Sequence, residues 1–135
     1  MIQMIFRHVT GARAPEIDVV PLGEHRELIL GRASSAAVRF DSRRDSQVGR
    51  HHARVTWNVR DGTGFLLTDL GSRNGTFVNA KRVEGTVVLT KNDMIQLGEG
   101  GPSVEISWET VPRQILEAFG DGERLDEEMG GRFVQ

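Results

Sequence analysis

Three short stretches of the sequence hold side chains that could together bind a dianionic group. Arg32 ends the run LILGR, and Arg50 lies in VGRHHA just ahead of another apolar run. Ser72, Arg73 and Asn74 are adjacent in LGSRNGT. A guanidinium bonds two phosphate oxygens at once, while hydroxyl, carboxamide and backbone N–H donors satisfy the remaining oxygens. If the three stretches meet at one end of a domain, they would form a phosphate site.

The elements that must position these stretches have the pattern of β-strands. Short runs rich in β-branched and aromatic residues are separated by Gly, Asp, Asn, Ser or Pro, with turns about every 8 to 12 residues, as in β-sandwiches. In ARVTWNVR, Val55, Trp57 and Val59 alternate with polar residues, which indicates one buried face. We therefore expect an all-β sandwich of two packed sheets, without helices before residue 111 and with binding loops at one end.

The expected strands are the runs MIQMIFRHV, EIDVV, ELILG, AVRF, HARVTWNV, GFLLTDL, TFVN, TVVL, DMIQLG and SVEISWE. Two of their connections have the sequence of tight turns. Asn74-Gly75 lies between strand-like runs, and both residue types tolerate the positive φ of a type I′ turn, so this pair predicts a hairpin. Asp61-Gly62, within RDGTG, predicts a second hairpin.

The composition fits one ordinary domain. The chain has 135 residues, 38% of them hydrophobic, and no cysteine, so we expect a core that needs neither disulfides nor a metal. A formal net charge of −2 argues against a nucleic-acid partner. No apolar run approaches the roughly 18 residues of a membrane helix, and the amino terminus lacks a secretion signal. These features predict a soluble, cytoplasmic chain without a membrane partner.

The composition changes after residue 111. Residues 112–135 hold three arginines and six acidic residues, whereas residues 1–111 are almost balanced, so the acidity belongs to the tail. Ile115, Leu116 and Phe119 could form one side of a short helix there. We expect a domain over 1–111 and, over 112–135, an acidic tail or linker. The tail is either a solvated extension or a segment that covers the basic loops or binds in trans.

Four motifs, in this order and at this spacing, resemble the forkhead-associated (FHA) domain family. They are GR at 31–32, VGRHHA at 48–53, DLGSRNGTFVN at 69–79 and DMIQLG at 93–98, and the resemblance covers nearly all of residues 2–109. FHA domains are β-sandwiches of about eleven strands that bind phosphothreonine peptides through loops at one end. The resemblance therefore implies a peptide-binding role for the residues around Asn74.

The resemblance implies a role for each residue that matches a family position. Arg32 matches the arginine that contacts phosphate, and Asn74 matches the asparagine whose amide holds the peptide main chain. Arg73 precedes that asparagine, and Arg50 follows the family's phosphate-binding serine, so both are secondary contacts. Ser72 joins the predicted phosphopeptide-binding set. The residues expected to support the site are Gly31, Gly49, His52, Gly71, Gly75 and Asn79, with His52 linking the loops by hydrogen bonds.

One position departs from the family pattern, because Gly49 stands where a phosphate-binding serine is usual. The missing hydrogen bond would weaken binding about ten- to a hundredfold. Arg50 or Arg73 could supply added charge instead, or the N–H of Gly49 itself could donate to phosphate. A neighbouring hydroxyl could also reach in, from Ser34, Ser35 or Ser46.

The sequence and the resemblance together predict a phosphothreonine-dependent binding module in Ser/Thr-kinase signalling. Its partner would be a phosphothreonine-containing protein, such as a Ser/Thr kinase or its substrate, and the module could be part of a longer polypeptide. The alternative is an adaptor that binds its partner independently of phosphate, which Gly49 favours. We expect no enzyme, cofactor or metal: His51 and His52 point to opposite faces of a strand, and no catalytic motif is present.

Overall fold

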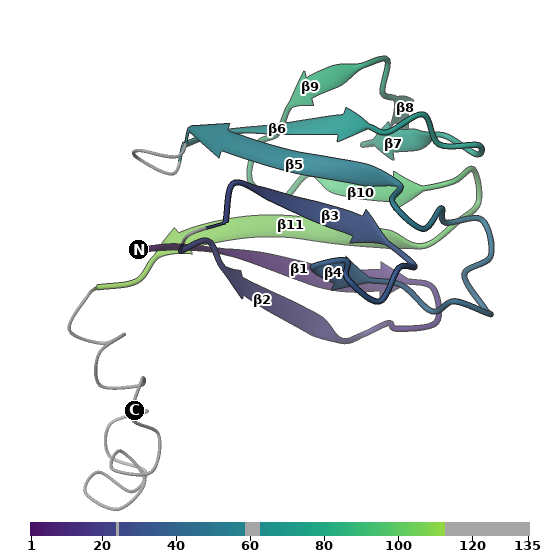
Figure 1. Ribbon diagram of the computed structural model, residues 1–135, viewed down its shortest axis with the longest axis horizontal. Coiled ribbons are helices and arrows are strands. Elements are labelled where there is room, and N and C mark those ends of the chain that lie inside the picture. Colours follow the sequence, from purple (N-terminus) through teal and green to yellow (C-terminus); the bar gives the residue numbers. More distant parts are fainter. Residues whose placement is uncertain (24, 59–62, 113–135) are drawn as a thin grey trace, which may run out of the picture.

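The computed structural model describes residues 1–23, 25–58 and 63–112 and contains, among these residues, strands but no helix (Figure 1). The strands are β1 (Ile2–Thr10), β2 (Ile17–Pro21), β3 (Glu27–Gly31), β4 (Val38–Arg39), β5 (Ala53–Asn58), β6 (Thr63–Asp69), β7 (Thr76–Val78), β8 (Lys81–Arg82), β9 (Thr86–Val88), β10 (Met94–Leu97) and β11 (Ser103–Thr110). Each of the runs expected from the sequence forms a strand. Only β8 was not expected.

The strands form two sheets that pack face to face. One sheet has the order β2-β1-β11-β10-β7-β8, and the other has the order β4-β3-β5-β6-β9. Their facing sides bury a continuous apolar core, whose largest members include Met4, Phe6, Leu28, Leu30, Phe40 and Phe65. The predicted all-β sandwich is therefore confirmed, because alternating apolar residues on both sheets meet in one interior.

The predicted β5–β6 pairing is present. β5 and β6 are antiparallel neighbours that pair from Ala53↔Asp69 to Asn58↔Thr63, with a register shift between Thr56 and Asn58. Val55 and Trp57 face the core as expected. The turn residues Asp61-Gly62, like Val59, lie outside the described residues. The acidic tail also lies outside them from residue 113 onward.

The hairpin predicted at Asn74-Gly75 is wrong. β6 and β7, which flank this pair, belong to different sheets, and Asn74 does not have a positive φ. The two-residue hairpin instead lies at Asn79-Ala80, where φ is 51° and 68° and where Val78 of β7 pairs with Lys81 of β8. A positive φ at both central residues is the geometry of a type I′ turn. The Asn74-Gly75 segment is a loop that crosses from one sheet to the other.

The loops that contain the predicted binding residues emerge at one end of the sandwich. The β3–β4, β4–β5 and β6–β7 connections lie at the right-hand end in Figure 1, whereas the amino terminus and the end of β11 lie at the opposite end. The sandwich thus positions the three stretches as neighbours, although they are distant in the sequence.

Candidate functional site

The β3–β4 loop is held against the β4–β5 loop by backbone hydrogen bonds. The Arg32 N–H donates to the Gly49 carbonyl at 3.0 Å, and the Ala33 N–H donates to the Arg50 carbonyl at 3.0 Å. This approach requires Gly31, because a Cβ at that position would lie 2.1 Å from the Arg50 carbonyl oxygen. The glycine before Arg32 therefore sets the spacing between two loops of the site.

The Arg32 side chain is half-buried and oriented by two backbone carbonyls. Its Nε donates to the Val48 carbonyl, and its Nη1 donates to the Ser42 carbonyl at 2.9 Å. A guanidinium has five N–H donors, so the two on Nη2 and one on Nη1 remain for a ligand. Arg32 is consequently fixed in place while it retains a fork of donors.

Arg32 and Arg50 line one cavity of about 430 Å³. Its lining consists of Arg32, Ala33, Ser34, Arg39, Ser42 and Arg50. Three guanidiniums and two hydroxyl-bearing residues therefore surround a space without a lining carboxylate. Within residues 1–23, 25–58 and 63–112, none of these arginines forms an ion pair. Such a cavity has the charge and the donors to hold a phosphate.

His52 connects the β4–β5 loop to the β6–β7 loop. Its ring is fully buried; Nδ1 accepts the Gly49 N–H at 2.9 Å, and Nε2 lies 2.8 Å from the Gly75 carbonyl, to which it donates as the neutral ring. Burial lowers the pKa of His52, although the Gly75 carbonyl and the charge of Asp69 oppose this shift. Each ring nitrogen therefore satisfies a backbone group on a different loop.

Gly49 has no donor left for a phosphate, because its N–H is engaged by His52. The expectation that this N–H could replace the missing serine hydroxyl is therefore corrected. Space for a side chain exists at this position, since a Cβ on Gly49 would meet nothing nearer than the His52 Nδ1 at 3.7 Å. Of the hydroxyl residues proposed to compensate, Ser34 lines the cavity, whereas Ser35 and Ser46 do not.

Asp69 organises the β6–β7 loop. Its carboxylate accepts hydrogen bonds from the Ser72 N–H, the Ser72 hydroxyl at 2.5 Å and the Thr76 hydroxyl at 2.6 Å. Burial alone would raise the pKa of Asp69, but these bonds outweigh it and hold the pKa below its usual value. The Ser72 oxygen also accepts the Gly75 N–H. In this structure Ser72 therefore uses its only hydroxyl proton to shape the loop.

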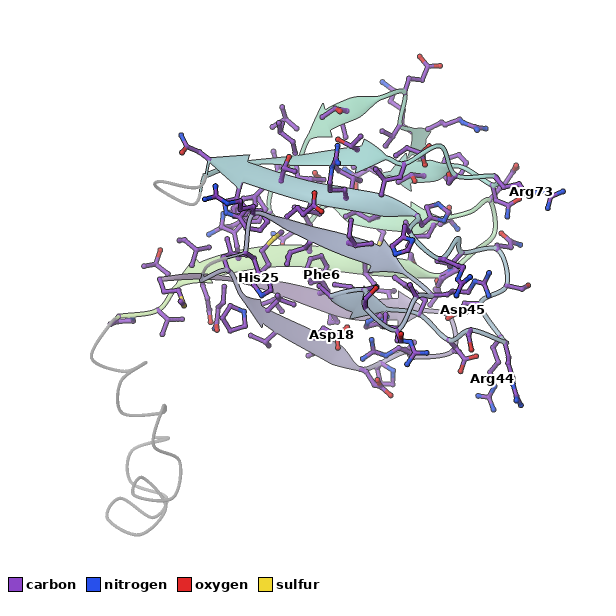
Figure 2. The ribbon with its side chains drawn as sticks, viewed as in Figure 1. Phe6, Asp18, His25, Arg44, Asp45 and Arg73 are labelled. Atoms are coloured by element: carbon purple, nitrogen blue, oxygen red, sulfur yellow. The ribbon has the colours of Figure 1, made fainter. Side chains whose placement is uncertain are left out.

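Asn74 joins the β6–β7 loop to the β4–β5 loop from the exposed side. Its Nδ2 donates to the Gln47 carbonyl at 2.9 Å, and its own carbonyl accepts the Glu99 N–H at 3.2 Å. Asn74 is exposed, and its second Nδ2 hydrogen and its Oδ1 have no partner among the described residues. Arg73 is exposed and points outward at the loop end, as Figure 2 shows.

The remaining supporting residues shape turns and loops. Asn79 donates to the Asp93 carboxylate and accepts the Met94 N–H, both at 2.9 Å, so it fixes the turn after β7 at a distance from the arginine cavity. Gly71 and Gly75 adopt positive φ values of 70° and 87° within the crossing loop. Such φ values favour glycine over residues with a Cβ.

A model of the FHA domain matches residues 28–98, which include Arg32, Arg50, Ser72, Arg73 and Asn74. This chain belongs to the FHA domain family. FHA domains are interaction modules, and the cavity at the loop end lies within the matched region.

Several known proteins are similar to this FHA domain. The transcriptional regulatory protein EmbR of Mycobacterium tuberculosis is 32% identical over 78 residues, which are 58% of this chain and only 19% of EmbR. A domain from a structural and functional analysis of phosphothreonine-dependent FHA domain interactions is 26% identical, with a TM-score of 0.64 over 81% of this chain and 99% of that one. The kinase-interacting FHA domain of the Arabidopsis kinase associated protein phosphatase is also 26% identical, with a TM-score of 0.64 over 82% and 98%.

Two polar residues of this FHA domain line the cavity although no sequence pattern pointed to them. Arg39 stands at an exposed position of the short strand β4, and Ser42 follows in the β4–β5 loop. In AVRF, an arginine next to a buried valine is indistinguishable from an ordinary solvated residue. Only the parallel pairing of β3 with β4, which places Arg39 opposite Gly31, brings it beside Arg32.

Proposed function

We propose that this FHA domain binds phosphothreonine in a partner protein and holds the phosphate in the arginine cavity. The observation that supports this most is Arg32, whose guanidinium is oriented by the Val48 and Ser42 carbonyls and still offers free donors. Arg50 would supply the second charge, since it lines the same cavity. The alignment of rigidly held donors with a dianion is the usual chemistry of phosphate recognition.

The peptide main chain would lie over the β6–β7 loop. Asn74 has a carboxamide oxygen and one amide hydrogen available, which match the N–H and C=O groups of an extended peptide. Arg73, exposed beside it, would contact residues that flank the phosphothreonine. Ser34 would supply the hydroxyl that Gly49 lacks.

The biological role that fits this chemistry is recognition of a Ser/Thr kinase or its substrate, by a non-enzymatic module in the cytoplasm. The kinase-interacting description of the Arabidopsis relative supports this role. We assign the module to residues 1–111 and the residues that follow to a tail or linker. The small matched share of EmbR is consistent with a module that can be part of a longer protein.

Gly49 supports a second candidate function, in which the same surface binds a partner independently of phosphate. Without a side chain at this position, one phosphate donor of the family pattern is absent. The two functions differ in what a phosphate adds to affinity. In the first, it supplies most of the binding energy; in the second, it supplies none.

Calorimetric titration at one fixed salt concentration distinguishes the two. The ligands are a degenerate phosphothreonine peptide pool and its phosphoserine and unphosphorylated counterparts. We expect binding of the phosphothreonine pool alone. Equal binding of all three pools would establish the phosphate-independent function instead.

The site assignment is tested with Arg32→Ala, for which we expect at least a tenfold loss of affinity, since charge-assisted hydrogen bonds contribute about 1.5–3 kcal/mol each. The control is Arg26→Ala, which removes the same charge from the β2–β3 connection at the opposite end of β3. Circular dichroism checks that both variants fold. An unchanged affinity for Arg32→Ala would refute the assignment of this residue to the phosphate.

A further inference from the structure

The arginine cavity holds more positive charge than one phosphate neutralises. Its lining contributes three guanidiniums, from Arg32, Arg39 and Arg50, and no carboxylate. A phosphothreonine has a charge of about −1.5 to −2 at pH 7, so roughly one positive charge remains unmatched when it binds. A cluster of cations next to a bound ligand favours a second anion on that ligand.

Arg39 carries the positive charge that the first phosphate does not neutralise. Its Nε donates to the Arg32 carbonyl at 3.4 Å, which is longer than an ordinary N–H···O bond, and no other donor of its side chain has a partner among the described residues. The side chain is exposed, whereas Arg32 is half-buried and fixed. Arg39 is therefore free to follow a ligand group at the outer wall of the cavity.

The backbone at Arg39 is held by hydrogen bonds despite the shortness of β4. The Arg39 carbonyl accepts a hydrogen bond from Arg13 Nη1 at 2.8 Å, and the next N–H, that of Phe40, donates to Gly31. Arg13 is itself paired with Glu16 at 2.8 Å and Asp18 at 2.6 Å. These pairs neutralise Arg13, so Arg39 is the cation that stays available on this side of the cavity.

A second hollow continues the surface past Arg39. It has a volume of about 340 Å³ and shares Arg39 and Ser42 with the first cavity, while Arg13, Phe40 and Asp41 complete its lining. Arg39 thus stands on the boundary between two adjoining hollows. A peptide whose phosphothreonine fills the first hollow could place a neighbouring side chain against Arg39.

We propose that Arg39 forms a second anion subsite, which selects partners that have another phosphate or a carboxylate close to the phosphothreonine. This inference rests on the proposed function, because the first phosphate must occupy Arg32 and Arg50. The ligand is a doubly anionic peptide segment. Its second anion is contacted by the Nη groups of Arg39, and its first is held deeper in the cavity.

The test is a peptide panel with one constant phosphothreonine. A second phosphothreonine, or a glutamate, stands in turn at each position within about four residues, a reach of roughly 13 Å. Calorimetry gives the Kd of each peptide for the whole chain and for Arg39→Gln, Arg26→Gln and Arg32→Ala. Arg26→Gln removes an equal charge from an exposed position far from the cavity.

We expect a gain of about five- to tenfold in affinity at one or two positions of the panel. Arg39→Gln should abolish that gain, because it weakens the doubly anionic peptides more than the singly phosphorylated one, and Arg26→Gln should keep the gain. If only the second phosphothreonine raises the affinity, the preferred ligand is a multiply phosphorylated segment. If the glutamate raises it as well, the preferred ligand is a phosphothreonine with an acidic flank.

Two results would overturn the subsite. In one, no position of the panel improves on the singly phosphorylated peptide. In the other, Arg39→Gln weakens that peptide as much as the doubly anionic ones, which would make Arg39 a ligand of the first phosphate. Failure of the proposed function is a separate result, because the wild-type chain would then bind the singly phosphorylated peptide no better than its unphosphorylated form.

Discussion

Gly49 offers a position where one added hydroxyl can be tested with little disturbance of the loop. A Cβ at Gly49 would lie 3.7 Å or more from every neighbouring atom outside the adjoining residues, and its φ is not in the left-handed region. Its neighbours in the chain are Val48, whose carbonyl holds Arg32, and Arg50, which lines the cavity. Gly49→Ser therefore places a donor beside the proposed phosphate without moving the backbone.

The expected result of Gly49→Ser is tighter phosphothreonine binding. A hydrogen bond to a charged group contributes about 1.5–3 kcal/mol, and the half-exposed setting of Gly49 favours the lower end, which corresponds to roughly a tenfold decrease in Kd. The measurement is calorimetric titration of one phosphothreonine peptide. Gly49→Ala is the matched control, because it adds the Cβ without the hydroxyl.

The comparison of the two variants separates the effect of the hydroxyl on peptide affinity from the effect of the Cβ. If serine and alanine bind the peptide equally well, the hydroxyl does not reach the phosphate, and the phosphate does not lie where the cavity places it. If both bind more weakly than glycine, a side chain at this position obstructs the ligand. The unfolding free energy of both variants should stay within about 1 kcal/mol of the wild type, since neither introduces a clash.

Three further predictions concern the supports of the site. Gly31→Ala places a Cβ against the Arg50 carbonyl and should lower the unfolding free energy by about 1–3 kcal/mol in urea titration, with Gly49→Ala as the unstrained comparison. His52→Ala leaves the partly buried Gly49 N–H and the buried Gly75 carbonyl without partners and should cost about 3–5 kcal/mol. The exposed His51→Ala should cost little, and equal losses would contradict the loop connection. Burial lowers the pKa of His52 below its usual 6.5, so the unfolded chain binds a proton there more readily than the folded chain does. The stability that His52 contributes is therefore present above pH 6.5 and declines as the pH falls toward the folded pKa. The stability gap between wild type and His52→Ala should therefore shrink below that pH, and a constant gap would refute the shift.

The fold was predictable from the sequence because a half-buried strand leaves a clear pattern. Val55 and Trp57 face the core as their alternation indicated. β8 left no such pattern, since Lys81 and Arg82 are both exposed and pair only because the turn before them reverses the chain. Short strands of this kind depend on a neighbour rather than on their own apolar residues.

The misplaced hairpin shows what turn chemistry alone cannot decide. Asn74-Gly75 has the residue types of a tight turn, but the bonds from Ser72 and Thr76 to Asp69 give the segment a different shape. A dipeptide sequence of this type indicates that the chain can bend there, but it does not indicate which sheet the next strand joins. The sheet assignment follows from pairing with β10, which is distant in the sequence.

The site was predictable in its residue types but not in its full membership. Arg32 and Arg50 were expected together, and both line the cavity. Arg39 was not expected, because its position beside Arg32 depends on a parallel pairing between β3 and β4 that no local pattern indicates. The engagement of the Gly49 N–H by His52 is likewise a contact between loops that sequence spacing does not encode.

The same loop contacts explain how the domain tolerates unpaired arginines so close together. Three cations around one cavity repel one another, and this repulsion would push the loops apart if no other contacts held them together. His52 and Asp69 oppose it through hydrogen bonds that are buried or partly buried and are therefore screened less by salt than exposed charges. An anion in the cavity converts the repulsion into attraction. Binding should accordingly weaken as the salt concentration rises.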